Sequence, residues 1–239
     1  MWQKEKGIVL GSVRHNDKSS VLHLFTEGCG HVSYVFYMTS SSKNITRNAL
    51  LQPLTLIGFE NRIVSSSSLQ HLREPVNLRP FSRIPFDPVR GSIALFLGEL
   101  FIHSLMEEGE NKPLFSFLTD AIYTLDSADD VRNLHLFIML RLSSYLGFGP
   151  NTDDYFEGCW LDLQNGVFVP SEPLNGLNPE LAYRAVQLLN CSAASDTGWI
   201  SMTGTQRSSL LGSLNTYYRL HLPSFPVLKS LEILQEVFG

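Results

Sequence analysis

The chain has 239 residues, 44% of them hydrophobic and 17% charged, which is enough apolar material to bury a core. No stretch approaches the roughly 18 consecutive apolar residues of a membrane span, and the apolar run at 8–10 is too short for a secretory signal. We therefore expect a cytoplasmic protein that makes no contact with membranes. The three cysteines, Cys29, Cys159 and Cys191, are odd in number and widely spaced, so we expect reduced thiols.

The net charge of −5 is distributed unevenly along the chain. Residues 1–80 carry nine Lys and Arg against five Asp and Glu, a net charge of +4, whereas residues 81–239 carry nine against eighteen, a net charge of −9. Such asymmetry indicates one part that faces a polyanion and one part that does not. Ordinary scatter of charge is the alternative interpretation.

The first 75 or so residues are typical of a β-domain, because short runs rich in Val, Leu, Tyr and Phe alternate with turns. Glycines at 28 and 30 predict a turn within 26–30, since glycine allows positive φ, and the Ser-rich segment 39–48 predicts a long loop. The expected strands are 6–13, 20–26, 31–38, 54–59 and 68–72. Five short strands in fewer than eighty residues favour a small barrel over a sandwich.

Prolines at 75, 80, 85 and 88 predict a connector, after which apolar residues recur every three or four positions, as on one face of a helix. Asn165-Gly166 predicts a β-hairpin, and Thr203 with Gln206 has the spacing of a capping box. The expected helices span 93–105, 114–125, 131–145, 178–188 and 203–218, with a last one opened by Pro226. We predict an α+β chain: a small β-barrel over residues 1–80 and a mostly helical domain over residues 81–239, with one hairpin near 160–169.

Motifs that carry chemistry are scarce in this sequence. It contains neither a phosphate-binding loop nor the G-x-S-x-G pattern of a nucleophile elbow. The acidic pairs at 107–108 and 129–130 lie where helices should begin or end, which favours a helix-dipole role. Cys29 and His31 form one close pair of potential ligands without a second pair nearby. We therefore expect no catalytic site, no metal and no cofactor.

The basic barrel is the remaining functional signal. A groove for single-stranded DNA needs cations that follow the phosphates and aromatic rings that stack on bases. Tyr34, Phe36 and Tyr37 could supply the rings, although burial in the barrel core is the alternative for each, just as the cations could form an ordinary solvated surface. The candidate DNA-binding cations are Lys6, Arg14, Lys18, Lys43, Arg47 and Arg62.

Short motifs follow an order that resembles one bacterial family. Segment 7–33 contains an apolar strand, a polar turn, a second strand ending in Leu24-Phe25-Thr26, and a glycine before a third strand. Further motifs are Leu51-Gln52-Pro53-Leu54, Glu99-Leu100, Leu140-Arg141-Leu142, Gly147-Phe148-Gly149-Pro150, Tyr217-Tyr218, His221-Leu222 and Lys229-Ser230. Together they resemble the recombination mediator RecO over nearly the full chain; each motif is weak alone, and their order is fairly specific.

The resemblance implies an N-terminal OB-fold and a helical C-terminal domain. It also implies a DNA repair protein, not an enzyme, that binds single- and double-stranded DNA, anneals strands, and helps RecR and single-stranded DNA-binding protein to load the recombinase. Two departures matter. Many members hold zinc with four cysteines where 151–170 keeps only Cys159, so we expect no zinc, and the basic loop has only Lys43 and Arg47. The alternative function is a protein-only adaptor whose OB-fold no longer binds DNA.

The resemblance also implies a site for the acidic tail of single-stranded DNA-binding protein. Such a peptide needs an apolar pocket beside a cation. Arg132 stands at the polar start of an expected helix, whereas Arg141 interrupts an apolar run and is expected to be a structural residue paired with a carboxylate. We therefore select Arg132 as the partner-binding residue.

Overall fold

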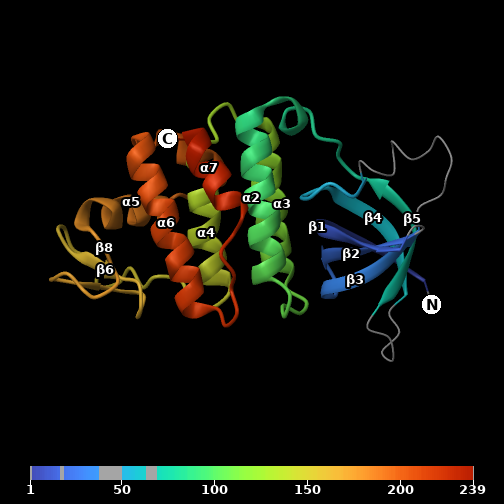
Figure 1. Cartoon of the computed structure of the whole chain (residues 1–239), viewed down its shortest axis with the longest axis horizontal. Helices are drawn as coiled ribbons and strands as arrows, with labels where there is room; N and C mark the ends of the chain where they lie inside the picture. Colours follow the sequence, from blue (N-terminus) through green and yellow to red (C-terminus); the bar gives the residue numbers. More distant parts are fainter. Residues whose placement is uncertain (1, 17–18, 38–49, 63–68, 239) are drawn as a thin grey trace. The chain divides into compact units, whose positions relative to one another are not determined.

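The structure is a computed structural model that describes residues 2–16, 19–37, 50–62 and 69–238 (Figure 1). The chain forms two compact units, Met1–Ile122 and Tyr123–Gly239. The division falls within helix α3 (Lys112–Ser127), so the first unit contains more than the barrel. Each unit is described by itself below.

The first unit is built on a closed five-stranded barrel with the strand order β1-β2-β3-β5-β4. Neighbouring strands are antiparallel except for the parallel pair β3–β5. The strands are β1 (Gln3–Asn16), β2 (Ser19–Thr26), β3 (Gly30–Tyr37), β4 (Leu56–Arg62) and β5 (Gln70–Asn77). The small barrel predicted from the sequence is confirmed, and its strand order agrees with an OB-fold.

The barrel interior is apolar and includes two of the three candidate aromatic residues. Tyr34 is fully buried and Phe36 nearly so, among Val9, Leu24 and Ile57. Tyr37, the last residue of β3, is 58% exposed. The core interpretation therefore holds for Tyr34 and Phe36, and only Tyr37 of these three is available to a ligand.

Strand β5 runs past Pro75, where the sequence predicted the start of a connector, so that prediction was wrong at this point. Gly58 of β4 lies opposite Val76, and Glu60 lies opposite Arg73, with a register shift between them. This bulge removes Pro75 from the ladder, where its missing N–H would otherwise leave an acceptor without a partner. Glu74, beside it, has a φ of 51°.

Helix α2 (Pro88–Ser104) and the part of α3 up to Ile122 complete the first unit after a short 3₁₀ turn, η1 (Ile84–Phe86). Asp87 caps α2 by accepting hydrogen bonds from the backbone N–H groups of Val89 (2.9 Å) and Arg90 (3.3 Å). Ile93, Leu97 and their neighbours at three- and four-residue spacing are buried, as the periodicity predicts.

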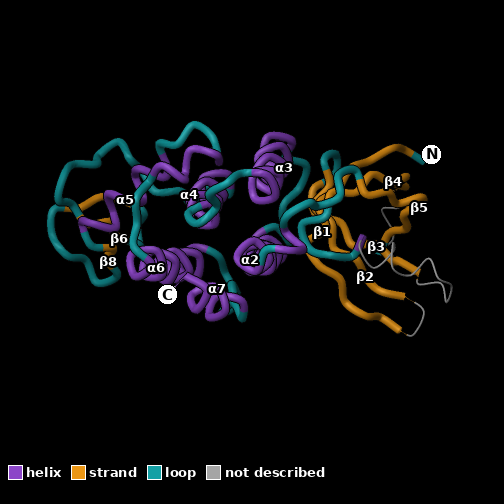
Figure 2. Tube along the Cα trace, turned by 90° about the horizontal axis from the view of Figure 1, so that it is seen from above, coloured by secondary structure: helices purple, strands orange, loops and turns teal. Residues whose placement is uncertain are grey.

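Among its described residues the second unit contains four further α-helices, one 3₁₀ helix and a small sheet (Figure 2). The helices are α4 (Leu134–Tyr145), α5 (Pro179–Leu189), α6 (Gly204–His221) and α7 (Ser230–Phe238). Helix α4 packs against both α5 and α6, and is buried on most sides, which is typical of a central helix. The Tyr218 hydroxyl of α6 donates to the Met139 carbonyl of α4 at 2.8 Å.

The helices of the second unit begin partly where the sequence predicted and partly elsewhere. The capping box is confirmed, because Thr203 and Gln206 exchange hydrogen bonds of 2.8 and 3.1 Å. Helix α7 begins at Ser230, so the prediction that Pro226 opens the last helix was wrong. The helix expected over 131–145 begins later, at Leu134 of α4, and residues 131–133 form a turn before it. The 3₁₀ helix η2 (Ala194–Trp199) has no apolar period that could predict it.

The predicted hairpin is confirmed as β6 (Trp160–Asp162) and β7 (Val167–Val169), and β8 (Gly176–Leu177) adds a third strand. Its loop is longer than the two residues expected, because Leu163 belongs to the loop 163–166. Gly166 closes this loop with a φ of 68° and donates its N–H to the Asp162 carbonyl at 2.8 Å. Among the described residues, no helix has the length and hydropathy to span a bilayer.

Candidate nucleic-acid interface

The structure describes three of the six candidate DNA-binding cations. Lys18, Lys43 and Arg47 lie outside the described residues. Arg14 lies near the end of β1 opposite Ser20, and Arg62 is the last residue of β4, opposite His71 of β5; both are exposed. Lys6 lies in the other half of β1, opposite Gly58.

Arg62 belongs to a row of residues that crosses the outer face of the barrel. Neighbouring strands pair Arg62 with His71, His71 with Val35, Val35 with Val21 and Val21 with Val13. Residues paired in this way project from the same face of a sheet. The side chains at the two ends of the row, Arg62 and Val13, are exposed, so this face is the outer one.

A hollow of about 620 Å³ lies over this face and is called here the β3–β5 groove. Its described lining combines two arginines with the rings of one Trp, one Tyr and one His, and it includes no Asp or Glu. The lining residues are Trp2, Val35, Tyr37, Arg62, Leu69, Gln70, His71, Leu72 and Arg73.

The three rings of the groove take part in two close contacts. The Arg73 guanidinium carbon lies 4.2 Å from the centre of the Trp2 ring, within the range of a cation–π interaction. The rings of Tyr37 and His71 stack with a centroid separation of 6.3 Å and an interplanar angle of 6°. The groove therefore offers both cations and flat rings on one face of the barrel.

A second hollow of about 450 Å³ lies elsewhere on the barrel and has a different charge. Its lining includes four carboxylates, those of Glu5, Glu27, Glu60 and Glu74, against the ammonium groups of two lysines, one of which is Lys6. The Lys6 ammonium lies 3.4 Å from the Glu27 carboxylate. The structure therefore does not bring Lys6 together with Arg62, and places it where neighbouring carboxylates offset its charge.

Sequence reasoning missed Trp2, His71 and Arg73. Trp2 was missed because the first strand was expected to begin at residue 6, whereas β1 begins at Gln3. The alternation along β5 could have found the other two, because His71 and Arg73 are two residues apart and so share a face. What that pattern could not supply is the parallel pairing of β3 with β5, which brings His71 beside Val35 and Tyr37.

The single Cys29/His31 pair does not develop into a metal centre. Burial raises the pKa of the Cys29 thiol, and the neighbouring Glu5 carboxylate raises it further. The thiol therefore keeps its proton at neutral pH, whereas metal ligation needs the thiolate. Within the part of the chain that the structure describes, no three His, Cys, Asp or Glu side chains are grouped to hold a metal ion. The absence of zinc stays a prediction.

Arg132 lies just before α4 in the second unit, with an exposed side chain. Its guanidinium bonds both carboxylate oxygens of Asp130, at 3.0 and 2.6 Å, and this contact holds the pKa of Asp130 below its usual range. Arg141 is half-buried and faces the Leu189 carbonyl at 3.5 Å, so the carboxylate partner expected for it is not the contact found. An anion at Arg132 would have to compete with Asp130.

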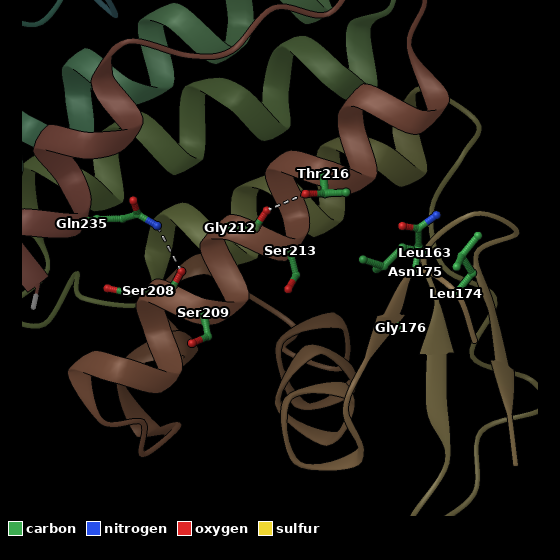
Figure 3. A pocket seen from close by; sticks show the side chains of 10 residues that line it. All are labelled: Leu163, Leu174, Asn175, Gly176, Ser208, Ser209, Gly212, Ser213, Thr216 and Gln235. Atoms are coloured by element: carbon green, nitrogen blue, oxygen red, sulfur yellow. Dashed lines mark hydrogen bonds between the residues drawn. The ribbon is translucent and has the colours of Figure 1, made fainter. Parts of the chain in front are cut away.

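A further hollow, of about 620 Å³, lies beside α6 in the second unit (Figure 3). The described residues that line it are uncharged, among them Ser209, Ser213 and Thr216, and include no Lys or Arg. The Thr216 hydroxyl already donates to the Gly212 carbonyl at 3.2 Å, and the Gln235 amide donates to the Ser208 carbonyl at 3.4 Å. Of these three hollows, the β3–β5 groove is therefore the one suited to a polyanion.

Comparison with known proteins gives one family for both parts of the chain. The family model described as "Recombination protein O N terminal" matches residues 1–81, and "Recombination protein O C terminal" matches residues 85–232. The chain is 41% identical to the "DNA repair protein RecO" of Phocaeicola vulgatus and 39% identical to that of Bacteroides fragilis, with 100% of each chain covered. The corresponding protein of Flavobacterium psychrophilum is 32% identical, with 99% of each chain covered.

Proposed function

Because this chain belongs to the RecO family of DNA repair proteins, we propose that it binds DNA in the β3–β5 groove of its barrel. The observation that carries this proposal is the composition of the groove, which combines Arg62 and Arg73 with three rings and has no carboxylate among its described lining residues. Arginines neutralise phosphates, and exposed rings stack on bases that are not paired.

The wider role that we propose is that of a non-catalytic recombination mediator in the cytoplasm. It binds single- and double-stranded DNA, anneals strands, and cooperates with RecR and single-stranded DNA-binding protein in loading the recombinase. Family membership supports these roles. Annealing and loading need binding surfaces and no bond chemistry in the protein itself. In this proposal residues 1–80 form the DNA-binding domain, and residues 81–239 hold the protein partners.

The test compares two double variants of the full chain that remove the same charge. Arg62→Ser with Arg73→Ser empties the groove of its arginines, whereas Lys4→Ser with Lys6→Ser removes two cations from the carboxylate-rich hollow. Fluorescence anisotropy of a labelled single strand is followed over a series of salt concentrations. The salt slope should become less steep by about 0.7 for each phosphate that the variant no longer neutralises. At that rate the salt slope should become less steep by about 1.4 for the arginine variant, and by much less for the lysine variant.

Equal changes of slope in the two variants would show that binding is distributed over the barrel and is not centred on the groove. No measurable DNA binding by the wild-type chain would favour the protein-only adaptor. Circular dichroism checks that both variants are folded.

The proposed contact between Arg132 and the acidic tail of single-stranded DNA-binding protein needs its own test. Family membership motivates it, and the ion pair with Asp130 weighs against it. A fluorescent tail peptide is titrated against the wild type, Arg132→Glu and Arg141→Glu. The proposal expects weaker binding only for Arg132→Glu. Equal binding by the wild type and this variant would remove Arg132 from the site.

A further inference from the structure

One side chain of the β3–β5 groove belongs to the residue type that changes charge near neutral pH. His71 of β5 is exposed, and its ring stacks on that of Tyr37 at a centroid separation of 6.3 Å. Within the part of the chain that the structure describes, neither ring nitrogen of His71 takes part in a hydrogen bond. The stack therefore orients the ring and leaves both nitrogens available to a ligand of the groove.

Two arginines share a face of the sheet with this histidine. Arg62 of β4 is the cross-strand neighbour of His71, and Arg73 lies two residues further along β5. Residues paired across strands, and residues two apart in one strand, project from the same face. All three side chains line the groove. A proton on His71 would therefore add a third cation to a face that already carries two.

The groove itself offers no negative charge that could neutralise this proton. Its described lining includes no carboxylate, and its other titratable side chain, apart from the arginines, is Tyr37 of β3. Glu60 of β4 and Glu74 of β5 line the carboxylate-rich hollow instead. The counter-charge for a protonated His71 therefore has to come from a ligand, and a phosphate of a DNA strand supplies it through a charge-assisted hydrogen bond.

We infer that His71 is a further phosphate contact of the β3–β5 groove, and that this contact forms when the imidazole is protonated. The inference rests on the proposed binding of DNA in this groove and adds regulation by pH to it. Histidine ordinarily gains its charge near pH 6.5. Because the DNA-bound chain holds more protons than the free chain in this range, linkage makes the affinity for DNA rise as the pH falls.

The test follows the fluorescence anisotropy of a labelled oligo-dT strand with the full chain, between about pH 8 and about pH 5.5 at constant ionic strength. Thymine does not titrate in this range, so a change of affinity reports on the protein. His71→Phe keeps a ring that can stack on Tyr37 and removes the titrating group. As the pH falls, the affinity of the wild type should rise about threefold more than that of this variant, as expected for one exposed ion pair. At the lower pH the salt slope of the wild type should be steeper by about 0.7, the value for one phosphate.

Two further variants separate charge from structure. Lysine is charged throughout this range, so His71→Lys should bind more tightly than the wild type near pH 8 and should vary less with pH. His103 of α2 is exposed and does not line the groove, so His103→Phe should keep the pH dependence of the wild type. Equal pH dependence in the wild type and His71→Phe, or an equal loss in His71→Phe and His103→Phe, would overturn the inference. Circular dichroism at each pH checks folding, and should His71→Phe fail to fold, the comparison of the wild type with His71→Lys still decides.

Failure of this inference can be told apart from failure of the proposed function. If Arg62→Ser with Arg73→Ser leaves DNA binding unchanged, the groove is not the DNA site, and the proposed function and this inference fall together. If the arginine variant weakens binding while His71→Phe keeps the full pH dependence, only the role of His71 is wrong.

Discussion

His135 of α4 is fully buried, and its ring stacks on that of Phe238 at a centroid separation of 5.1 Å. Burial lowers the pKa of this imidazole to about 3, and the nearby Arg207 guanidinium contributes to the shift. The imidazole is therefore neutral in the folded protein at any pH above that value. In the unfolded chain the same group titrates near 6.5, the ordinary value for histidine.

This difference in pKa gives a stability that depends on pH. Between about 6.5 and 3 the unfolded chain binds a proton that the folded chain does not, so the free energy of unfolding falls as the pH is lowered. The contribution of His135 approaches about 1.4 kcal/mol per pH unit below 6. Replacing His135 with Phe should remove this part of the slope in urea unfolding between pH 7.5 and 4.5. The exposed His15, replaced in the same way, is the control, and equal slopes in the two variants would contradict the assignment.

Single residues were the least predictable level of the candidate site. The sequence selected Arg62, which lies in the groove, and Lys6, which does not. Composition treats these two cations alike, because only the strand pairing separates one hollow from the other. The sequence also left open whether three aromatic residues stack on bases or pack in the barrel core. Burial decides this for Tyr34, Phe36 and Tyr37.

At the level of elements, local signals predicted what is decided locally. The apolar periods of α2 and α3, the Thr203 capping box and the hairpin near 160–169 depend on near neighbours in the chain, and all are confirmed. The predictions for the end of β5 and for the start of α7 were wrong. A bulge admits Pro75 into β5, and nothing at Pro226 itself marks the later start of α7 at Ser230.

Three glycines allow the loop of the hairpin to be tested. Gly166 has a φ of 68°, and an added Cβ would lie 2.7 Å from the Tyr217 hydroxyl oxygen. Gly158 has a φ of 85° with nothing within 4 Å, whereas Gly109 has open space and no positive φ. Substitution by Ala should therefore lower the free energy of unfolding most at Gly166, by about 1 kcal/mol at Gly158, and least at Gly109. Urea unfolding measures the order, and equal effects at Gly166 and Gly158 would show that contact with Tyr217 is unimportant.

The small sheet of the second unit has an apolar interior in the segment 151–170, for which we expected no zinc. Cys159 and Leu161 are buried, and the Tyr155 ring packs edge-on against that of Phe168 at 5.2 Å. We predict that protein purified without chelator contains no zinc and that EDTA leaves its unfolding midpoint unchanged. Elemental analysis and thermal unfolding measure the two. Zinc near one equivalent per chain, or a lower midpoint in EDTA, would contradict the prediction.

At the scale of the whole molecule, charge sets the condition for DNA binding. The chain has a net charge of −5, so its overall field repels a polyanion. Affinity therefore has to come from cations placed close enough to phosphates to act within a Debye length, about 8 Å at physiological salt. Residues 1–80 carry an excess charge of +4, and we propose that their cations supply this affinity.

This condition leads to a prediction for a variant in which Arg14, Lys18, Lys43, Arg47 and Arg62 are all replaced by Ser. Contacts with phosphates carry no base sequence, so affinity should fall equally for poly-dT, poly-dA and a mixed strand. The salt slope on a single strand should become less steep by up to about 3.5, at about 0.7 for each phosphate. Arg73 remains in this variant, so weak binding should persist through the β3–β5 groove. An unchanged salt slope in a folded variant would place the DNA contacts outside these five residues. A loss of affinity that depends on the base would show that these five residues read bases and not phosphates.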